Sequence, residues 1–265
     1  MVTEGGTHLD LREHIASPAK KQPYVNRLFA TIAGRYDFIT RFLSYGMDRR
    51  WKRRLVELAC LRGGELVLDL ACGTGDITFA LAERLPGGQA VGLDITPEMI
   101  RIAEQKRRSG HSRRASFGQG DIMRLPFAAG TFDCVTGGYA LRNVPDLGGA
   151  LAEIHRVLKP GGRLLSLDFG KPRWALYRWL YLRYLAAVGA ALGLVLHRDP
   201  DAYRYIPESL KLYPGQYELL GLMRQSGYVD QGHQDFLGGI MAINWARKPE
   251  AVEGRRQTAG GEQKE

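Results

Sequence analysis

Glycines and acidic residues follow short apolar segments in this chain, a pattern typical of a site for a nucleotide or nucleoside. Residues 67–78, VLDLACGTGDIT, place Gly73 and Gly75 between an apolar run and a predicted helix. Glycines in such a turn let the backbone approach a ligand without an intervening Cβ. Asp69 ends the apolar run, where we expect its carboxylate to reach an amino group of the ligand.

The neighbours of the turn distinguish three ligands. A dinucleotide turn has a third glycine where this chain has Thr78, and Asp76 would repel its pyrophosphate. A triphosphate loop needs Gly-Lys followed by Ser or Thr, which the sequence lacks. S-adenosylmethionine carries a sulfonium and an ammonium and no phosphate, so acidic residues suit it. We therefore predict S-adenosylmethionine as the cofactor.

Two further acids extend the predicted cofactor site. Asp94 follows the second apolar segment, about 20 residues after the glycines, where an acid usually accepts hydrogen bonds from the ribose hydroxyls. Asp121 follows the third segment, where it can accept from the adenine amino group while the N–H of Ile122 donates. An acid at a strand end is often only a helix cap. The succession of all these residues predicts a nucleoside site.

The elements that must position these residues alternate along the chain, which predicts a mostly parallel sheet buried on both faces. We expect a further helix from residue 151 that ends at Lys159, before Pro160, and a closing hairpin of 228–236 and 240–247. The fold class is α/β: a Rossmann-like class I methyltransferase fold with a seven-stranded sheet, an antiparallel last strand and a helical insertion. The remaining predicted strands lie at 65–70, 90–95, 115–121, 131–138 and 162–169, and helices at 77–85 and 97–108.

One domain with polar ends is expected. Residues 1–20 and 250–265 have little to bury and are predicted to be flexible or disordered tails, which leaves 21–249 as a single methyltransferase domain. The aromatic segment at about 171–225 is the predicted insertion. It forms either a packed helical layer or a lid over an apolar substrate pocket.

Charge and cysteine content indicate the setting. The 265 residues include 37 Lys and Arg against 28 Asp and Glu, and the net charge of +9 favours an anionic partner such as nucleic acid or lipid headgroups. Three cysteines without Cys-x-x-Cys spacing argue against disulfides and zinc, and no metal site is predicted. No signal peptide or membrane-length apolar run is present, so we expect a cytoplasmic protein.

Longer blocks of the sequence resemble the ubiquinone/menaquinone biosynthesis C-methyltransferases. They are RYD and LSYG within 28–53, ALRNVPD at 140–146 and YRYIPESL at 203–210, and the resemblance runs from about 25 to 247. It implies methylation of a ring carbon of a prenylated hydroquinone, with 2-demethylmenaquinol to menaquinol as the favoured reaction. A ubiquinone precursor or a phytyl-naphthoquinol is the alternative acceptor.

A nucleic-acid methyltransferase is a more distant alternative, motivated by the net charge. Enzymes that methylate exocyclic amines usually carry Asn/Asp-Pro-Pro-aromatic after the fourth strand, where this chain has GGYALRN. We therefore predict no nucleic-acid partner.

The resemblance also implies site residues. Arg142 and Asn143 are expected to face the quinol oxygens, with Arg142 holding a phenolate as an ion pair. The alternative is that Arg142 pairs with Asp146. The cofactor contacts implied by the resemblance fall at Thr74, Asp94, Asp121, Ile122 and Gly138, the last of which is often a serine in relatives.

Three more residues are expected to bind the acceptor or relay a proton. Tyr36 and Asp37 belong to the RYD block and Tyr205 to the insertion. The alternative for both tyrosines is that they are packing aromatics.

A prenyl tail needs an apolar groove, whose expected walls are the aromatic insertion and residues 29–51. The basic clusters at 49–54 and 106–114 could then rest on anionic lipid, which predicts transient, peripheral contact at the inner face of a membrane. The alternative is that they are solvated faces. The sequence leaves homo-oligomerisation open.

Overall fold

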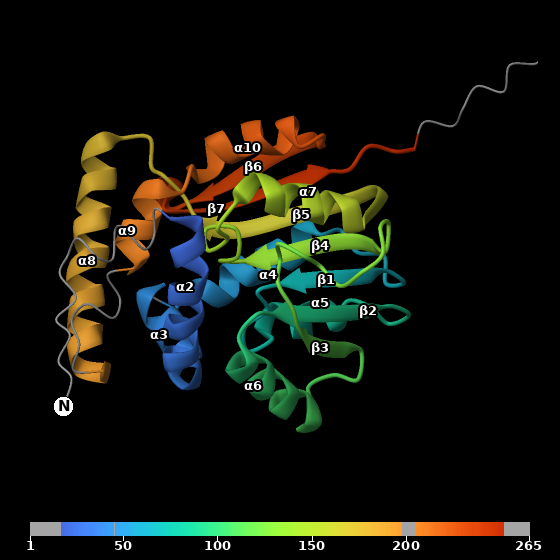
Figure 1. The fold of residues 1–265 in the computed structure, drawn as a ribbon, viewed down its shortest axis with the longest axis horizontal. Coiled ribbons are helices and arrows are strands. Elements are labelled where there is room, and N and C mark those ends of the chain that lie inside the picture. Colours follow the sequence, from blue (N-terminus) through green and yellow to red (C-terminus); the bar gives the residue numbers. More distant parts are fainter. Residues whose placement is uncertain (1–16, 45, 198–204, 252–265) are drawn as a thin grey trace, which may run out of the picture.

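Seven strands form a single sheet in the order β3-β2-β1-β4-β5-β7-β6. The structure is a computed structural model that describes residues 17–44, 46–197 and 205–251 (Figure 1). Strand β7 runs antiparallel to both of its neighbours and the other pairs are parallel. The predicted fold class and its antiparallel last strand are confirmed. The strands are β1 (Leu66–Leu70), β2 (Gln89–Asp94), β3 (Ala115–Gln119), β4 (Phe132–Gly138), β5 (Leu158–Phe169), β6 (Val229–Phe236) and β7 (Met241–Arg247).

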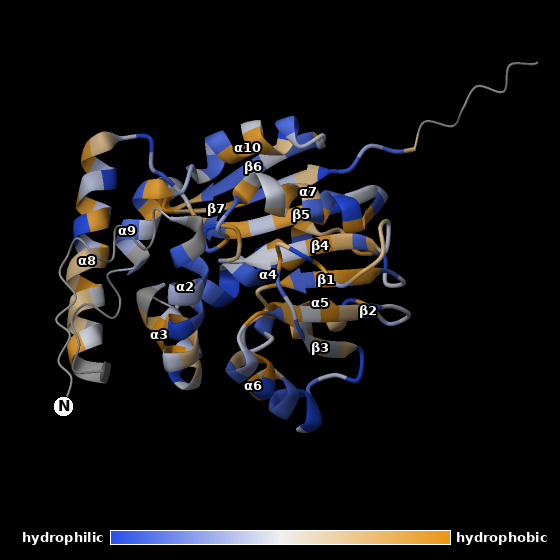
Figure 2. Cartoon of the chain, viewed as in Figure 1, coloured by the Kyte–Doolittle hydropathy of each residue, from blue (hydrophilic) through white to orange (hydrophobic). Residues whose placement is uncertain are grey.

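Both faces of the sheet carry an apolar layer, because successive strand residues point to opposite sides. In β1, Val67 packs with α4 (Asp48–Leu58) and α5 (Asp76–Ala82), whereas Leu68 packs with α7 (Leu147–Val157) and α10 (Gly215–Gln225). Helix α6 (Pro97–Arg108) packs against β2 and β3. Figure 2 shows apolar residues along the central strands between these helices.

Four helices gather at the edge of the sheet to which the parallel strands point, on the left of Figure 1. They come from the N-terminal part of the chain and from the predicted insertion. None of the described helices combines the length and the apolar character that crossing a bilayer requires. The four are α2 (Pro18–Ile32), α3 (Tyr36–Leu43), α8 (Ala175–His197) and α9 (Tyr205–Leu212).

The predicted tails lie mostly outside the described residues, which begin at 17 and end at 251. Residues 18–20, expected in the N-terminal tail, instead begin α2. Proline is well suited to the first turn of a helix, because its fixed φ is helical and its missing N–H is not needed there.

The end of α7 also differs from the prediction. The helix stops short of Lys159, and Leu158 is already extended and begins β5. Lys159 binds Asp133 at 2.8 Å instead of the helix end. The cation that donates to the carbonyls of the helix end is Lys248, whose Nζ lies 2.8 Å from the oxygen of His155 and 2.7 Å from that of Leu158. A cation near the last turn favours the helix dipole, and a residue distant in sequence therefore adds to Arg156 of the last turn itself.

Candidate active site

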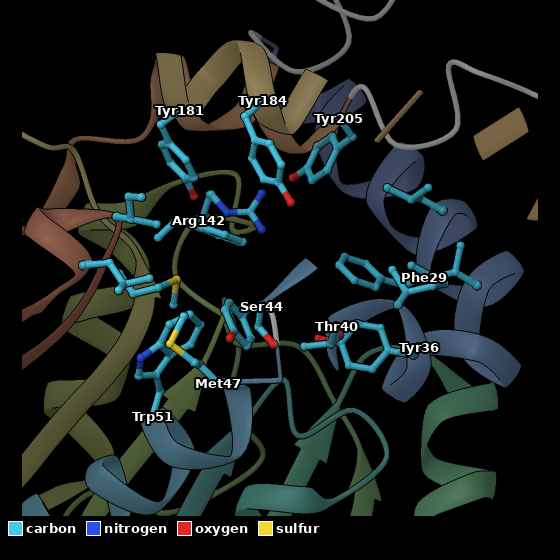
Figure 3. A pocket seen from close by; sticks show the side chains of 18 of the residues that line it. Phe29, Tyr36, Thr40, Ser44, Met47, Trp51, Arg142, Tyr181, Tyr184 and Tyr205 are labelled. Atoms are coloured by element: carbon cyan, nitrogen blue, oxygen red, sulfur yellow. The ribbon is translucent and has the colours of Figure 1, made fainter. Parts of the chain in front are cut away.

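Two adjoining cavities lie at the carboxyl ends of the parallel strands, the usual place for ligands in open α/β sheets. The smaller has a volume of about 70 Å³ and lies over the ends of β1 to β4. The larger has a volume of about 500 Å³ and lies between α2, α3, α8 and α9 (Figure 3). Phe29, Tyr36 and Tyr139 line both cavities and form their common wall.

The smaller cavity brings together five of the predicted cofactor residues. Asp94 is central among them, because its carboxylate accepts from the N–H groups of Gly73 and Thr96, each at 2.8 Å. Burial raises the pKa of Asp94. These bonds hold the glycine turn against the end of β2. The five residues are Gly73, Asp94, Asp121, Ile122 and Gly138.

Asp121 and Gly138 define two sides of this cavity. The Asp121 carboxylate accepts from the N–H of Met123 at 2.9 Å, which orients it beside the backbone of Ile122. At Gly138 a Cβ would clash with the end of the Ile77 side chain. A side chain at this position would therefore require the end of Ile77 to move aside.

Asp69 does not line either cavity, although its position in sequence predicted a contact with the cofactor. It is buried, and its oxygens accept from the hydroxyls of Thr78 at 2.7 Å and Thr136 at 2.9 Å. Burial raises the pKa of Asp69 to about 6. In this structure Asp69 joins β1, β4 and α5 behind the cavity.

Thr74 and Gly75 also support the site from outside its lining. The Thr74 hydroxyl donates to Asp37 at 2.6 Å. Gly75 adopts φ +92° and begins α5, with the rings of Phe79 and Phe117 packed against its α-carbon. These residues shape the turn, and its backbone at Gly73 faces the cavity. Among the described residues, no three His, Cys, Asp or Glu side chains are grouped to hold a metal ion.

The larger cavity is mostly apolar and aromatic, and most of its lining comes from the two segments predicted to form a groove, with the rest from residues at the ends of β4, β5 and β6 and the start of β7. Figure 3 shows Tyr181 and Tyr184 directed into it from α8, opposite Met47 and Ser44. The Arg142 guanidinium enters the cavity between the tyrosines. A cationic group in an apolar chamber of this size suits an aromatic ligand with an ionisable oxygen.

Arg142 is buried and pairs with Asp168, not with Asp146. Its Nε donates to Asp168 at 3.3 Å and its Nη1 donates to the Ser209 hydroxyl. Burial raises the pKa of Asp168, an effect that Arg142 opposes. The sequence analysis did not identify Asp168. It lies near the end of β5, just as Asp69 and Asp94 lie at the ends of β1 and β2. Nη2 of Arg142 donates to no residue that the structure describes.

Asn143 and Tyr205 connect the two cavities. The Tyr205 hydroxyl donates to Oδ1 of Asn143 at 2.8 Å, and Asn143 donates to the Tyr139 carbonyl at 2.7 Å. Asn143 lines the smaller cavity and Tyr205 lines the larger one. Burial raises the pKa of Tyr205 to about 12. The hydrogen bonds of Asn143 and Tyr205 therefore fix the side chains that line the two cavities where they adjoin.

Tyr36 and Asp37 are adjacent in sequence, but their side chains face different cavities. Tyr36 faces both cavities, and burial of its hydroxyl raises its pKa to about 12. Asp37 faces an outer groove, where it binds Thr74 and Lys106, the latter at 2.9 Å. The predicted contact of Asp37 with the acceptor is therefore not found, and Asp37 instead ties α3 to the glycine turn.

Tyr139 was missed by the sequence analysis, although it lies between the predicted site residues Gly138 and Arg142. It has φ +60°, rare for a residue with a side chain, and its hydroxyl donates to Asp48 at 2.8 Å. Asp48 also binds Lys52 at 2.7 Å. Burial, reinforced by Asp48, raises the pKa of Tyr139 well above its usual value.

Lys21 was also missed, because nothing in its sequence neighbourhood indicates a partner. Its Nζ donates to the carbonyls of Arg142 at 3.0 Å and Val144 at 2.6 Å. Burial lowers the pKa of Lys21 to about 8. Through these bonds α2 is held over both cavities.

Comparisons with known proteins match this geometry. Residues 17–248 match the ubiE/COQ5 methyltransferase family. The chain is 38% identical over 251 residues to the ubiquinone/menaquinone biosynthesis C-methyltransferase UbiE of Teredinibacter turnerae, which covers 94% of this chain and 100% of that protein. It is 39% identical over 222 residues to the demethylmenaquinone methyltransferase of Thermus thermophilus, which covers 84% and 100%.

Solved structures show the fold. A SAM-dependent methyltransferase from Aquifex aeolicus aligns with a TM-score of 0.55 and 16% identity, over 74% of this chain and 88% of that chain. The phosphoethanolamine N-methyltransferase 2 of Haemonchus contortus, solved with S-adenosylhomocysteine, aligns with a TM-score of 0.58 and 15% identity, over 75% and 52%.

Proposed function

Because the chain belongs to the ubiE/COQ5 methyltransferase family, we propose that it converts 2-demethylmenaquinol to menaquinol. The family comprises S-adenosylmethionine-dependent C-methyltransferases of quinone biosynthesis, and this chain is one of them. The choice of acceptor is the proposal. A prenylated acceptor partitions into bilayers, so we propose that the chain meets it at a membrane surface.

The adjoining cavities are the observation that carries this proposal. The larger is wide and apolar enough for a fused aromatic ring and the first part of a prenyl tail, and it shares a wall with the smaller. Bound in the smaller cavity, S-adenosylmethionine supplies a methyl group on a positively charged sulfur. Holding the two reactants in contact where the cavities adjoin, beside Tyr36 and Tyr139, would align them and exclude water, which are the main needs of a methyl transfer.

Arg142 would bind the acceptor's oxygen as a phenolate. Asp168 and Ser209 fix the orientation of the guanidinium, and its Nη2 remains available to donate. A cation beside a hydroxyl favours the ionised form, and the phenolate makes the neighbouring ring carbon a better nucleophile.

Tyr139 and Asp48 would take the proton that the ring loses. In the proposed transfer the ring carbon would gain the methyl group as the sulfur–methyl bond broke, and the sulfur would keep that electron pair. The carbon then releases its hydrogen as a proton. Tyr139 can accept it while passing its own proton to Asp48, to which it is already hydrogen-bonded.

The test is a methyl-transfer assay with labelled S-adenosylmethionine and short-tailed, chemically reduced demethylmenaquinone. A reduced ubiquinone precursor serves as the parallel acceptor. Arg142→Lys is the informative variant, because a lysine keeps a cation beside Asp168, whereas Arg142→Ala would leave that buried carboxylate unpaired.

We expect label in the naphthoquinol and a fall in kcat of about tenfold or more for Arg142→Lys, because the phenolate loses its planar donor. Label in the benzoquinol alone would contradict the proposed acceptor. An unimpaired variant would contradict the role of Arg142.

A further inference from the structure

Helix α8 is apolar on the side that faces away from the larger cavity as well as on the side that lines it. Tyr181 and Tyr184 point inward from α8 (Figure 3). The outer side is exposed at every described position from Leu176 to Leu194, and Arg183 is the one charged residue among these positions. The apolar residues on that side are Leu176, Trp179, Ala187, Ala191 and Leu194, and Leu180 lies at the border between that side and the cavity.

A helix that is hydrophobic all round is normally buried on all sides. Here α8 stands at the outside of the molecule, with apolar residues along its length (Figure 2). Trp174, just before the helix, is 80% exposed, Leu176 71% and Leu194 59%. This extent of exposed aromatic and aliphatic surface indicates that something covers it.

The positive charge of residues 170–197 favours a negatively charged partner on this surface. Residues 170–197 contain no aspartate or glutamate, but they contain Lys171, Arg173, Arg178 and Arg183. The guanidinium of Arg183 lies 5.2 Å from the centre of the Trp179 ring. Tryptophan and arginine beside an apolar helix face are typical of helices that lie in the headgroup region of a bilayer.

The outer surface of α8 is also continuous with the larger cavity. Leu180 lines that cavity and is 51% exposed, and Leu237 lines it and is 44% exposed. The Tyr177 hydroxyl bonds the Leu237 carbonyl at 3.0 Å and joins α8 to the end of β6 at this point. Leu180 and Leu237 therefore give an apolar chain an apolar edge at which to leave the cavity.

We propose that the outer face of α8, from Trp174 to Leu194, docks on an anionic lipid bilayer and delivers the prenyl tail into the larger cavity. The delivery step rests on the proposed acceptor, whereas the docking itself does not. A second copy of the chain would fit less well, because a symmetric interface would bring arginines together without an acidic partner.

Flotation of the full chain with vesicles tests the docking. The vesicles are phosphatidylcholine alone, or phosphatidylcholine with roughly one third phosphatidylglycerol. The α8 variant is Trp174→Ser with Trp179→Ser, since neither residue lines a cavity. The charge control is Arg62→Glu with Arg224→Glu, two exposed arginines outside α8 and outside both basic clusters, and the apolar control is Val229→Ser, on exposed Val229 of β6.

We expect the wild type to float with the anionic vesicles and to be released by salt. The α8 variant should need about tenfold more lipid for half-maximal binding, and both controls should change it less than about twofold. In solution, the α8 variant should methylate a short-tailed acceptor as the wild type does, which separates a failure of docking from a failure of the proposed reaction.

Three results would overturn the docking proposal. They are a wild type that does not float, an α8 variant that floats as well as the wild type, and a wild-type dimer in sedimentation velocity that the α8 variant dissociates without any binding to vesicles. The last would assign the face to a second copy of the chain.

A variant with Arg183→Glu, which keeps the apolar face, should lose preference for the anionic vesicles.

Discussion

At the scale of single residues, burial and partners separate carboxylates that look alike in sequence. Asp69 and Asp94 lie at the C-terminal ends of neighbouring parallel strands, and both are nearly inaccessible to solvent. Asp69 bonds two threonine hydroxyls, whereas Asp94 bonds the backbone of the glycine turn and lines the smaller cavity. One carboxylate therefore joins strands and a helix behind the cavity, and the other lines the cavity itself.

The raised pKa of Asp69 predicts a pH-dependent stability. A carboxyl group whose folded pKa is about 6, above its usual 3.8, binds more protons in the folded state. Its contribution to stability is complete below pH 3.8 and is lost as the pH rises through 6. Asp69→Asn should therefore gain stability relative to the wild type between pH 4 and 6, by at most about 3 kcal/mol, and then level off.

Urea unfolding of both proteins at several pH values between 4 and 8 measures this difference. A difference that stays constant over the range would show that Asp69 has the same pKa in the folded and unfolded chains.

The role proposed for Tyr139 predicts a loss of turnover when its hydroxyl is removed. Tyr139→Phe keeps the ring between the cavities but cannot pass a proton to Asp48. We expect kcat to fall roughly 10–100-fold while the KM for the acceptor changes little. Steady-state kinetics with a short-tailed acceptor measure both.

Tyr217→Phe is the matched control, because the Tyr217 hydroxyl also donates to a carboxylate, Asp235, at 3.0 Å, away from both cavities. Equal losses in the two variants would show that the effect is structural. An unchanged kcat for Tyr139→Phe would remove Tyr139 from the proton path.

At the scale of elements, the start of α5 depends on close packing around the glycine turn. A Cβ at Gly75 would lie 2.8 Å from the Phe117 ring and 2.9 Å from the Phe79 ring. The backbone there is left-handed, which only glycine adopts without cost. A side chain at Gly75 would therefore displace the rings of Phe79 in α5 and Phe117 in β3.

Gly75→Ala should lower the free energy of unfolding by about 1 kcal/mol for the backbone and by roughly 1–3 kcal/mol more for the displaced rings. Gly110→Ala is the control, because Gly110 has φ +100° and open space around it. Gly110→Ala should lower the free energy of unfolding only by the backbone contribution of about 1 kcal/mol. Urea unfolding measures both, and equal costs would show that the rings adapt freely.

At the scale of the whole molecule, Arg142 joins the sheet to the insertion. It follows β4, pairs with Asp168 at the end of β5 and bonds Ser209 in α9. The guanidinium also lies over the rings of Phe169 and Tyr205, at 5.4 and 5.7 Å. The wall of the larger cavity and the packing of α9 therefore depend on one buried cation.

Removing Arg142 or Asp168 alone should lower the free energy of unfolding more than removing both. Arg142→Ala leaves a buried carboxylate unpaired, at a cost of about 3–5 kcal/mol. The double variant Arg142→Ala with Asp168→Ala should recover part of that stability, but it should remain as inactive as the single variant. Strictly additive losses of stability in a double-mutant cycle would show that the two groups do not interact.

The sequence by itself determined the sheet, its antiparallel last strand and the place of the smaller cavity. Parallel strands bring their carboxyl ends to one edge, so the order of Gly73, Asp94, Asp121 and Gly138 along the chain already implied a common site. The family resemblance added Arg142 and the apolar walls. These inferences depend on local patterns, which a single chain displays directly.

Only the tertiary structure decided which side chains face a ligand and which are occupied by one another. Asp69 meets Thr136, Arg142 meets Asp168, Tyr139 meets Asp48 and Lys248 meets the end of α7 across long stretches of sequence. Such pairs form because buried polar groups must be satisfied by whatever the packing brings near. Their partners depend on how the elements pack in space, which local sequence patterns do not specify.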